Sequence, residues 1–293
     1  MDAKNLLLIA LAFFAVFFAF VIGVRIRREL AAPGGSVKPS AATLVTGFIT
    51  NFFDTLGIGS YATTTAIFRK WKLVADELIP GTLTVGHTAP VIIQAYIFTT
   101  LVPVETTMLL TMIAAAVLGS WIGSGVVVKL PQRSIQLGMG LALTGAAILM
   151  ALSVAKLIPG GGTDLGLTGT KLAVALVGNF VLGALMTIGI GMYAPCMIMI
   201  YLLGMNPTAA FPIMMGSCAF LMPTASYRFI KAERFDFRAV LGLAIGGLPA
   251  VLIAAYLVKS LPLDAVRVLV VIVVLYTATG LLRSARSTTF PAA

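Results

Sequence analysis

The chain has 293 residues, of which 59% are hydrophobic and only 10% are charged. A soluble globular domain carries about 25% charged residues, so the composition predicts an all-α polytopic membrane protein. The 20 Lys and Arg residues outnumber the 10 Asp and Glu residues. They do not indicate nucleic-acid binding, because they occur in short clusters between apolar runs, as membrane topology requires.

The first apolar run, residues 6–24, is too long for the core of a signal peptide. Its charges, Arg25, Arg27 and Arg28, follow the run instead of preceding it. We therefore expect residues 1–40 to form an uncleaved transmembrane helix, over about residues 5–24, followed by a basic linker. Its N-terminus is expected outside the cell.

Hydropathy divides the rest of the chain into two repeats, residues 41–156 and residues 169–293 with the C-terminal tail, joined by a Gly-rich loop at 157–168. Each repeat is expected to contain one Gly-broken segment followed by three transmembrane helices. These helices are predicted at 80–102, 106–128 and 134–156 in the first repeat, and at 211–229, 239–258 and 265–282 in the second.

The two broken segments share an unusual motif. Residues 55–62 read Thr-Leu-Gly-Ile-Gly-Ser-Tyr-Ala, and residues 187–194 read Thr-Ile-Gly-Ile-Gly-Met-Tyr-Ala, at an offset of 132 residues. Broken helices at membrane depth are tolerated only where they are buried in protein or line a cavity. A pair of them in matching positions of two halves is the best sequence indication of the substrate site of a secondary transporter.

The distribution of basic residues predicts how the repeats are oriented. Of the 20 Lys and Arg residues, 15 lie on the cytoplasmic side when that side contains 25–40, 69–79, 129–133, 228–238 and the C-terminal tail. The equivalent loops of the two repeats then face opposite sides, so the repeats are predicted to be inverted. Residues 41–68 would form a hairpin that reaches the bilayer midplane from inside, and residues 170–204 one from outside.

The glycines of the motif have two interpretations. They either adopt backbone angles closed to other residues and expose amides to a ligand, or they serve tight helix packing. A new helix is expected after each break, with Ser60 and Thr63 available as caps in the first and Pro195 in the first turn of the second. Two helix N-termini would then meet near the midplane and bind an anion without any fixed cation.

Two titratable residues stand out. Of the ten acidic residues, only Asp54 is expected at membrane depth, where it either caps the loop by bonding backbone amides or carries a coupling proton. His87, the one histidine, is either a packed, hydrogen-bonded residue or a group that contacts substrate or titrates. The candidate substrate-binding residues are Asn51, Asp54, Thr55, Gly57, Ile58, Gly59, Ser60, Tyr61, Thr63, His87, Thr88, Gln94, Thr187, Gly189, Ile190, Gly191, Tyr193 and Ser217.

No metal or other cofactor is expected. Cys196 and Cys218 lie in apolar segments without a partner at metal-ligand spacing. One histidine and one intramembrane acid cannot supply the three or four ligands of a usual metal site, which argues against a membrane-embedded enzyme. A passive anion channel remains an alternative, since the sequence does not reveal whether both hairpins ever open together.

Residues 51–59 (Asn-Phe-Phe-Asp-Thr-Leu-Gly-Ile-Gly) and 202–212 (Leu-Leu-Gly-Met-Asn-Pro-Thr-Ala-Ala-Phe-Pro) resemble the TauE/SafE family of sulfite and organosulfonate exporters. The similarity spans about residues 41–285. The resemblance implies a multi-pass transporter of the bacterial inner membrane that exports a small sulfur-containing anion such as sulfite or sulfoacetate. The expected partners are this anion and the lipid bilayer; a homodimer is left open.

Overall fold

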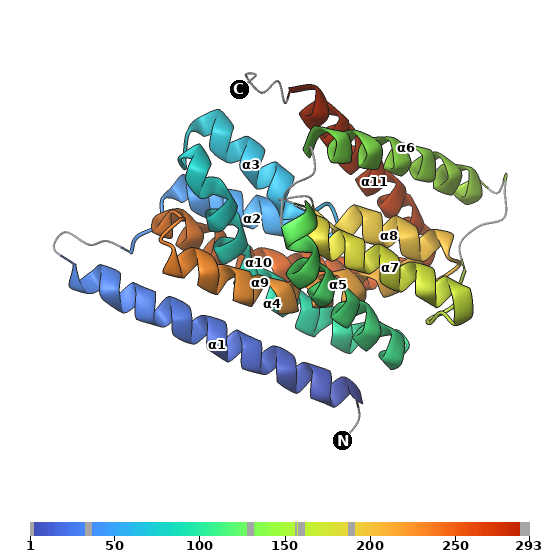
Figure 1. The fold of residues 1–293 in the computed structure, drawn as a ribbon, viewed down its shortest axis with the longest axis horizontal. Coiled ribbons are helices and arrows are strands. Elements are labelled where there is room, and N and C mark those ends of the chain that lie inside the picture. The colour runs from blue at the N-terminus through green and yellow to red at the C-terminus, as the bar shows by residue number, and fades with distance from the viewer. Residues whose placement is uncertain are drawn as a thin grey trace. The chain divides into compact units, whose positions relative to one another are not determined.

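A computed structural model describes residues 3–32, 37–127, 132–155, 157, 162–186 and 191–287. In these residues the chain is helical throughout, apart from its loops and one isolated β-bridge. The described residues form eleven α-helices and two 3-10 turns, and Figure 1 shows the helices as a ribbon. The helices are α1 (Ala3–Ala31), α2 (Ala41–Thr55), α3 (Ser60–Trp71), α4 (Ile79–Leu101), α5 (Thr106–Val127), α6 (Gln132–Val154), α7 (Gly169–Met186), α8 (Tyr193–Leu202), α9 (Ala210–Lys231), α10 (Phe237–Ser260) and α11 (Leu263–Ser287).

The predicted element order is confirmed. One N-terminal helix precedes two sets of five helices, and in each set the first two helices, at the broken segment, are shorter than the three that follow. Among the described residues, five helices are long and apolar enough to cross a membrane, namely α1, α7, α9, α10 and α11. By length and composition the chain is therefore a multi-pass membrane protein. The inversion of the repeats stays a prediction.

Helices α4, α5 and α6 form at the expected positions but do not meet the same criterion over their described residues. In α4 the reason is polar content, because buried threonines, His87 and Gln94 alternate with its apolar residues. Most of α4 is buried inside the protein, where polar side chains are tolerated when they have hydrogen-bond partners. The partners of His87 and Gln94 lie on the first broken segment.

The chain divides into two compact units. Unit 1 consists of Met1–Leu101 and Met215–Lys259, and unit 2 of Val102–Met214 and Ser260–Ala293. Unit 1 thus contains α1 to α4, most of α9 and α10, whereas unit 2 contains α5 to α8 and α11. Each unit therefore combines segments of both sequence repeats.

In unit 1, the first arm of the broken segment, α2, packs closely against α10. A Cβ atom added to Gly246 would lie only 2.1 Å from the carbonyl oxygen of Leu44. Asn51 reaches across the same contact, and its Nδ2 donates to the carbonyl oxygen of Leu243 at 3.4 Å. Small residues at such a crossing allow the two backbones to approach, which is how helices associate where lipid removes the hydrophobic driving force.

Unit 2 contains a contact of the same kind between α7 and α5. A Cβ atom on Gly183 would lie 2.1 Å from the carbonyl oxygen of Ala116, and Nδ2 of Asn179 donates to the carbonyl oxygen of Met112 at 2.7 Å. Helices α2 and α7 are the first arms of the two broken segments, and α10 and α5 are the second long helices after them. In both units, therefore, a first arm packs against the second long helix of the other repeat.

The N-terminal helix α1 lies along the outside of unit 1, next to α4 and α9 (Figure 1). Aromatic pairs join it to α9: the ring centroids of Phe14 and Phe220 are 5.3 Å apart, and those of Phe17 and Tyr227 are 6.1 Å apart. Its buried residues are Leu7, Leu11 and Phe18, and the others are exposed or half-buried, as expected for a helix that faces lipid on one side.

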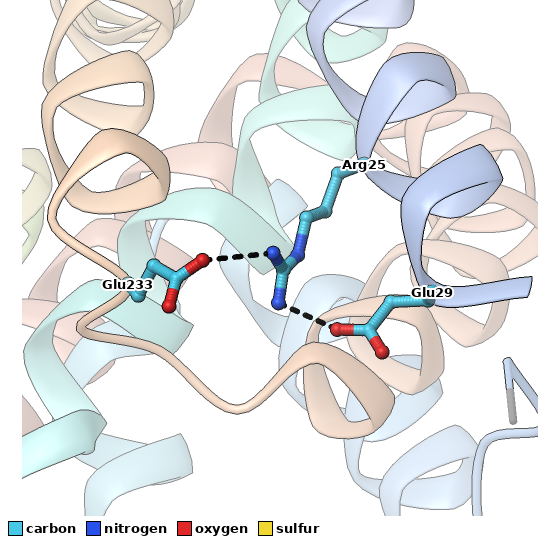
Figure 2. Close-up of polar contacts among 3 residues, drawn as sticks. All are labelled: Arg25, Glu29 and Glu233. Atoms are coloured by element: carbon cyan, nitrogen blue, oxygen red, sulfur yellow. Dashed lines mark hydrogen bonds and ion pairs between the residues drawn. The ribbon is translucent and has the colours of Figure 1, made fainter. Parts of the chain in front are cut away.

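One arginine connects the end of α1 to the loop between α9 and α10. Figure 2 shows the Arg25 guanidinium between Glu29 of its own helix, at 2.5 Å, and Glu233, at 3.1 Å. Its Cζ atom also lies 5.8 Å and 5.9 Å from the ring centroids of Phe235 and Phe237. A guanidinium held by two carboxylates and two aromatic rings positions α1 on unit 1.

Candidate functional site

The candidate site begins at the break between α2 and α3. Gly57 has a φ of 97° and Gly59 a φ of 84°, in the region that favours glycine, as the sequence predicts. The turn is closed by Gly57 N–H, which donates to the carbonyl oxygen of Asp54 at 2.8 Å. A Cβ atom on Gly59 would meet nothing within 4 Å. Tight helix packing therefore does not account for Gly59, and its backbone angles do.

Asp54 lies directly behind this break and is only 2% exposed. One carboxylate oxygen, Oδ1, accepts the backbone N–H of Ser60 at 2.6 Å, and the other, Oδ2, accepts Nε2 of Gln94 at 3.0 Å. Within the described part of the chain, no Lys or Arg pairs with this carboxylate. The negative charge of this buried carboxylate is thus compensated by N–H donors and by the N-terminus of α3.

The predicted caps of α3 need a correction. Its N-cap residue is Gly59, which has no side chain to cap with. The hydroxyl of Thr63 donates backward to the carbonyl oxygen of Ser60 at 2.9 Å and caps no amide. The capping group is the Asp54 carboxylate, because a turn with two glycines brings it back over the first N–H of α3.

Gln94 fixes the hairpin to α4 from a position 40 residues along the chain. Its Nε2 donates both to Asp54 and to the hydroxyl oxygen of Thr55, the latter at 2.9 Å. The Thr55 hydroxyl in turn donates to the carbonyl oxygen of Asn51 at 2.8 Å. Both hydrogens of the amide are therefore used, and its orientation is set by the network.

His87 of α4 is completely buried and joins both arms of the hairpin. Its Nδ1 lies 3.0 Å from Oδ1 of Asn51 on α2, and its Nε2 lies 3.1 Å from the hydroxyl of Thr64 on α3. Because Nδ2 of Asn51 donates to Gly47, its Oδ1 is the acceptor, so Nδ1 of His87 carries a proton. In the neutral ring Nε2 then accepts from Thr64.

A second group of hydroxyls continues along α4 toward α9. The Tyr61 hydroxyl donates to Oγ1 of Thr84 at 3.3 Å, and the Thr88 and Ser226 hydroxyls are 2.8 Å apart. Thr64, Thr84 and Ser226 are not among the predicted site residues. Thr64 and Thr84 each lie four residues from a predicted one, at helical spacing, which is a usable signal; nothing local marks Ser226.

Hydrogen bonds in unit 1 thus join these predicted residues to one another or to Thr64, Thr84 and Ser226: Asn51, Asp54, Thr55, Gly57, Ser60, Tyr61, Thr63, His87, Thr88 and Gln94. Ser217 is also buried in unit 1, on α9. Ile58 and Thr63 are half-buried beside the break. A surface pocket of about 230 Å³ in unit 1 lies at the other end of α2, beside Lys38 and Arg238, and not at the break.

The second broken segment is described only in part. Thr187, Gly189 and Ile190 lie outside the described residues. Gly191 is exposed, and a Cβ atom there would meet nothing within 4 Å. Tyr193 is buried as the first residue of α8, and Pro195 stands in the first turn as predicted. A site shared by the two broken segments stays a prediction.

In the part of the chain that the structure describes, no group of three His, Cys, Asp or Glu side chains is arranged to hold a metal ion. The network offers N–H and O–H donors from a helix N-terminus, an amide and several hydroxyls. Such donors suit a small anion at a place where a fixed cation would be costly.

Comparison with known families then bears on the second half of the chain. Residues 170–292 match the family Sulfite exporter TauE/SafE. The TauE/SafE match covers the second broken segment and α9 to α11, which is less than half of the chain, and it confirms the predicted resemblance. Residues 51–59, at the first break, lie outside the matched range. Comparisons with curated proteins and with solved structures found no match.

Proposed function

We propose that the chain is a secondary transporter of the TauE/SafE type that moves a small sulfur-containing anion, such as sulfite, sulfoacetate or a related organosulfonate, outward across the bacterial inner membrane. The observation that carries this proposal is the break between α2 and α3, where Gly57 and Gly59 place a helix N-terminus beside buried polar side chains inside a multi-pass membrane protein. The TauE/SafE match over residues 170–292 supports the class of substrate.

The donors around the break fit an oxyanion of sulfur. Sulfite and sulfonates present three oxygens that accept hydrogen bonds in diverging directions. In unit 1 the Ser60 N–H, the Gln94 amide and the hydroxyls of Thr55 and Thr64 lie in one buried network, where they donate to protein acceptors that a substrate oxygen would have to replace. Donors of this kind bind a charged oxygen more strongly than a neutral one, without the cost of a buried Lys or Arg.

The packing of the two units supports the inverted arrangement that the sequence predicts. In each unit, the first arm of one repeat contacts the second long helix of the other repeat. The contacts are Gly246 with Leu44 in unit 1 and Gly183 with Ala116 in unit 2. Repeats related by a pseudo-two-fold axis in the membrane plane generate such reciprocal contacts. The N-terminus would then lie outside and the C-terminus in the cytoplasm, following the basic loops.

Flux into proteoliposomes tests the proposal. The purified protein is reconstituted, and uptake of sulfite, sulfoacetate, taurine and sulfate is measured with and without an imposed pH gradient. We expect uptake of at least one of the sulfur anions, saturable and above that of empty vesicles. Flux that only follows the anion's own gradient would indicate the passive channel instead, and absence of flux for every anion would refute both.

A further inference from the structure

We propose that Asp54 is an internal competitor of the transported anion, and that protonation of its carboxylate makes way for the substrate. The ionised carboxylate occupies the donors at the start of α3, and the neutral carboxylic acid releases them. This inference rests on the proposed function and adds to it the coupling ion, one proton for each substrate anion. It also assigns the acidic residue a role in which it never contacts the substrate as a charged group.

The first observation is how completely Asp54 uses these donors. Oδ1 accepts the Ser60 N–H at 2.6 Å, and Oδ2 accepts Nε2 of Gln94 at 3.0 Å. An ionised carboxylate accepts through both oxygens, whereas the neutral acid turns one oxygen into a donor. A sulfite or sulfonate oxygen needs the same N–H groups that the carboxylate holds. The two anions are therefore alternatives at one place.

The second observation is the absence of compensating charge. The titratable groups that face this region are Tyr61 on α3, His87 on α4 and Cys218 on α9, while α10 faces α2 with residues 242–247. The described cations of these elements lie at helix ends: Arg69 and Lys70 in the last turn of α3, Arg228 and Lys231 in the last turn of α9, and Arg238 at the start of α10. Tyr61 and Cys218 have no positive form, and Nε2 of His87 is positioned to accept from a hydroxyl. A substrate anion beside the ionised carboxylate would meet repulsion that no described cation offsets.

Protonation of Asp54 lets the substrate anion replace the carboxylate at its N–H donors. A proton from the aqueous phase that the site faces adds to one carboxylate oxygen of Asp54, forming an O–H bond and removing the negative charge. The Ser60 N–H and the Gln94 amide then bind the substrate anion. When the anion leaves on the other side, the proton leaves with it, and the carboxylate takes back both donors. One proton and one substrate anion consequently move in the same direction. Outward transport then follows the anion's own gradient, whereas an inward proton gradient drives the anion inward.

Binding measurements over a series of pH values test this exchange. Sulfoacetate is the probe, because its sulfonate does not titrate in the neutral range, and binding is followed by calorimetry in detergent. For the native protein the apparent affinity should rise about tenfold for each unit of falling pH while Asp54 is ionised in the free protein. In Asp54→Asn the affinity should not depend on pH, and in Asp54→Glu the dependence should return.

Asp236→Asn is the matched control. Asp236 also accepts a backbone N–H at a helix start, that of Ala239 at 2.8 Å, but it lies at the start of α10, away from the break. We expect the pH dependence of binding to be unchanged in this variant. Loss of the pH dependence in both variants would overturn the proposal.

Flux separates the inference from the proposed function. Asp54→Asn should still exchange sulfoacetate across the membrane, but an inward proton gradient should no longer drive its accumulation. Accumulation that persists in Asp54→Asn overturns the proton role while leaving the transporter intact. Absence of any sulfur-anion flux in the native protein would instead refute the transporter itself.

Gln94→Ala is a second variant that tests the proposal if Asp54→Asn fails to fold. It removes one of the shared donors, and with it one hydrogen bond of Asp54, but keeps the carboxylate itself. The proposal expects weaker sulfoacetate binding in Gln94→Ala with the pH dependence retained. Unchanged binding in Gln94→Ala would show that the substrate does not use the donor that Asp54 holds.

Discussion

At the scale of single residues, the break between α2 and α3 depends on glycine for conformation and not for space. Gly59 has a positive φ of 84°, and nothing lies within 4 Å of the position of its missing Cβ. A β-branched residue would be strained there whatever the surrounding room. The identity of residue 59 should therefore affect the geometry of the site more than the folding of the helices around it.

Gly59→Val should abolish anion flux while leaving membrane insertion intact, because valine preserves hydropathy and disfavours the backbone angles of the break. The measurement is proteoliposome uptake, with the amount of protein in the vesicles determined in parallel. Gly23→Val on α1 is the matched control, since Gly23 also has no neighbour within 4 Å but has ordinary helical angles. Normal flux in Gly59→Val would contradict a role for the break.

Thr64→Val should lower the free energy of unfolding by about 1–3 kcal/mol, because it leaves Nε2 of buried His87 without its donor. Thr63→Val is the control on the same helix: its hydroxyl bonds only backbone carbonyls and is half-buried, so the loss should be smaller. Unfolding in a denaturant series in detergent gives both values. Equal losses of unfolding free energy in the two variants would show that the hydrogen bond between Thr64 and His87 contributes no more than an ordinary hydroxyl bond on α3.

At the scale of elements, α1 is held on unit 1 by a small number of side chains. Only Leu7, Leu11 and Phe18 of this helix are buried, and the aromatic pairs with α9 and the Arg25 cluster of Figure 2 add to their contacts. Glu233 is largely exposed, which makes its ion pair with Arg25 weak. The two phenylalanine rings and the partly buried Glu29 contribute more.

Arg25→Gln should destabilise the docking of α1 by about 1 kcal/mol, since it removes the cation from both the ion pairs and the aromatic rings. Hydrogen exchange of the α1 backbone, followed by mass spectrometry, measures this as faster exchange near residue 25. Arg28→Gln is the control, because Arg28 lies one turn away and is exposed. The same increase in both variants would mean that charge at the membrane surface, and not the cluster, positions α1.

At the scale of the whole molecule, each unit is built from both sequence repeats. The reciprocal contacts of α2 with α10 and of α7 with α5 leave each repeat without its main packing partner when it is alone. The order of elements along the chain therefore differs from the order in which they pack. A duplicated sequence here does not mean two independent folding domains.

Neither residues 1–156 nor residues 157–293 should give a stable protein when expressed alone, whereas co-expression of the two should restore it. The reason is that the small-residue faces of α2 and α7 stay uncovered in the separate halves. Size-exclusion chromatography in detergent and thermal unfolding measure the outcome. A single half that elutes as one species and unfolds cooperatively would contradict the reciprocal packing.

Much of this protein was determined by its sequence alone. Long apolar runs predict helices because each backbone group must be satisfied within its own segment in lipid, and the helices form where the runs lie. The angles of Gly57 and Gly59 are equally local, since a Gly-Ile-Gly turn after a helix favours positive φ. The TauE/SafE resemblance followed from the same short motifs.

Only the tertiary structure decided which side chains meet. Ser60 and Thr63 were reasonable caps by local rules, yet the cap of α3 comes from Asp54, which the turn carries back over the helix start. Gln94 and Ser226 entered the network because α4 and α9 pack beside the hairpin, at separations of 40 and 138 residues from their partners. Hydrogen bonds between residues so far apart in the sequence depend on which helices pack together, and the hydropathy of a segment does not indicate its packing partner.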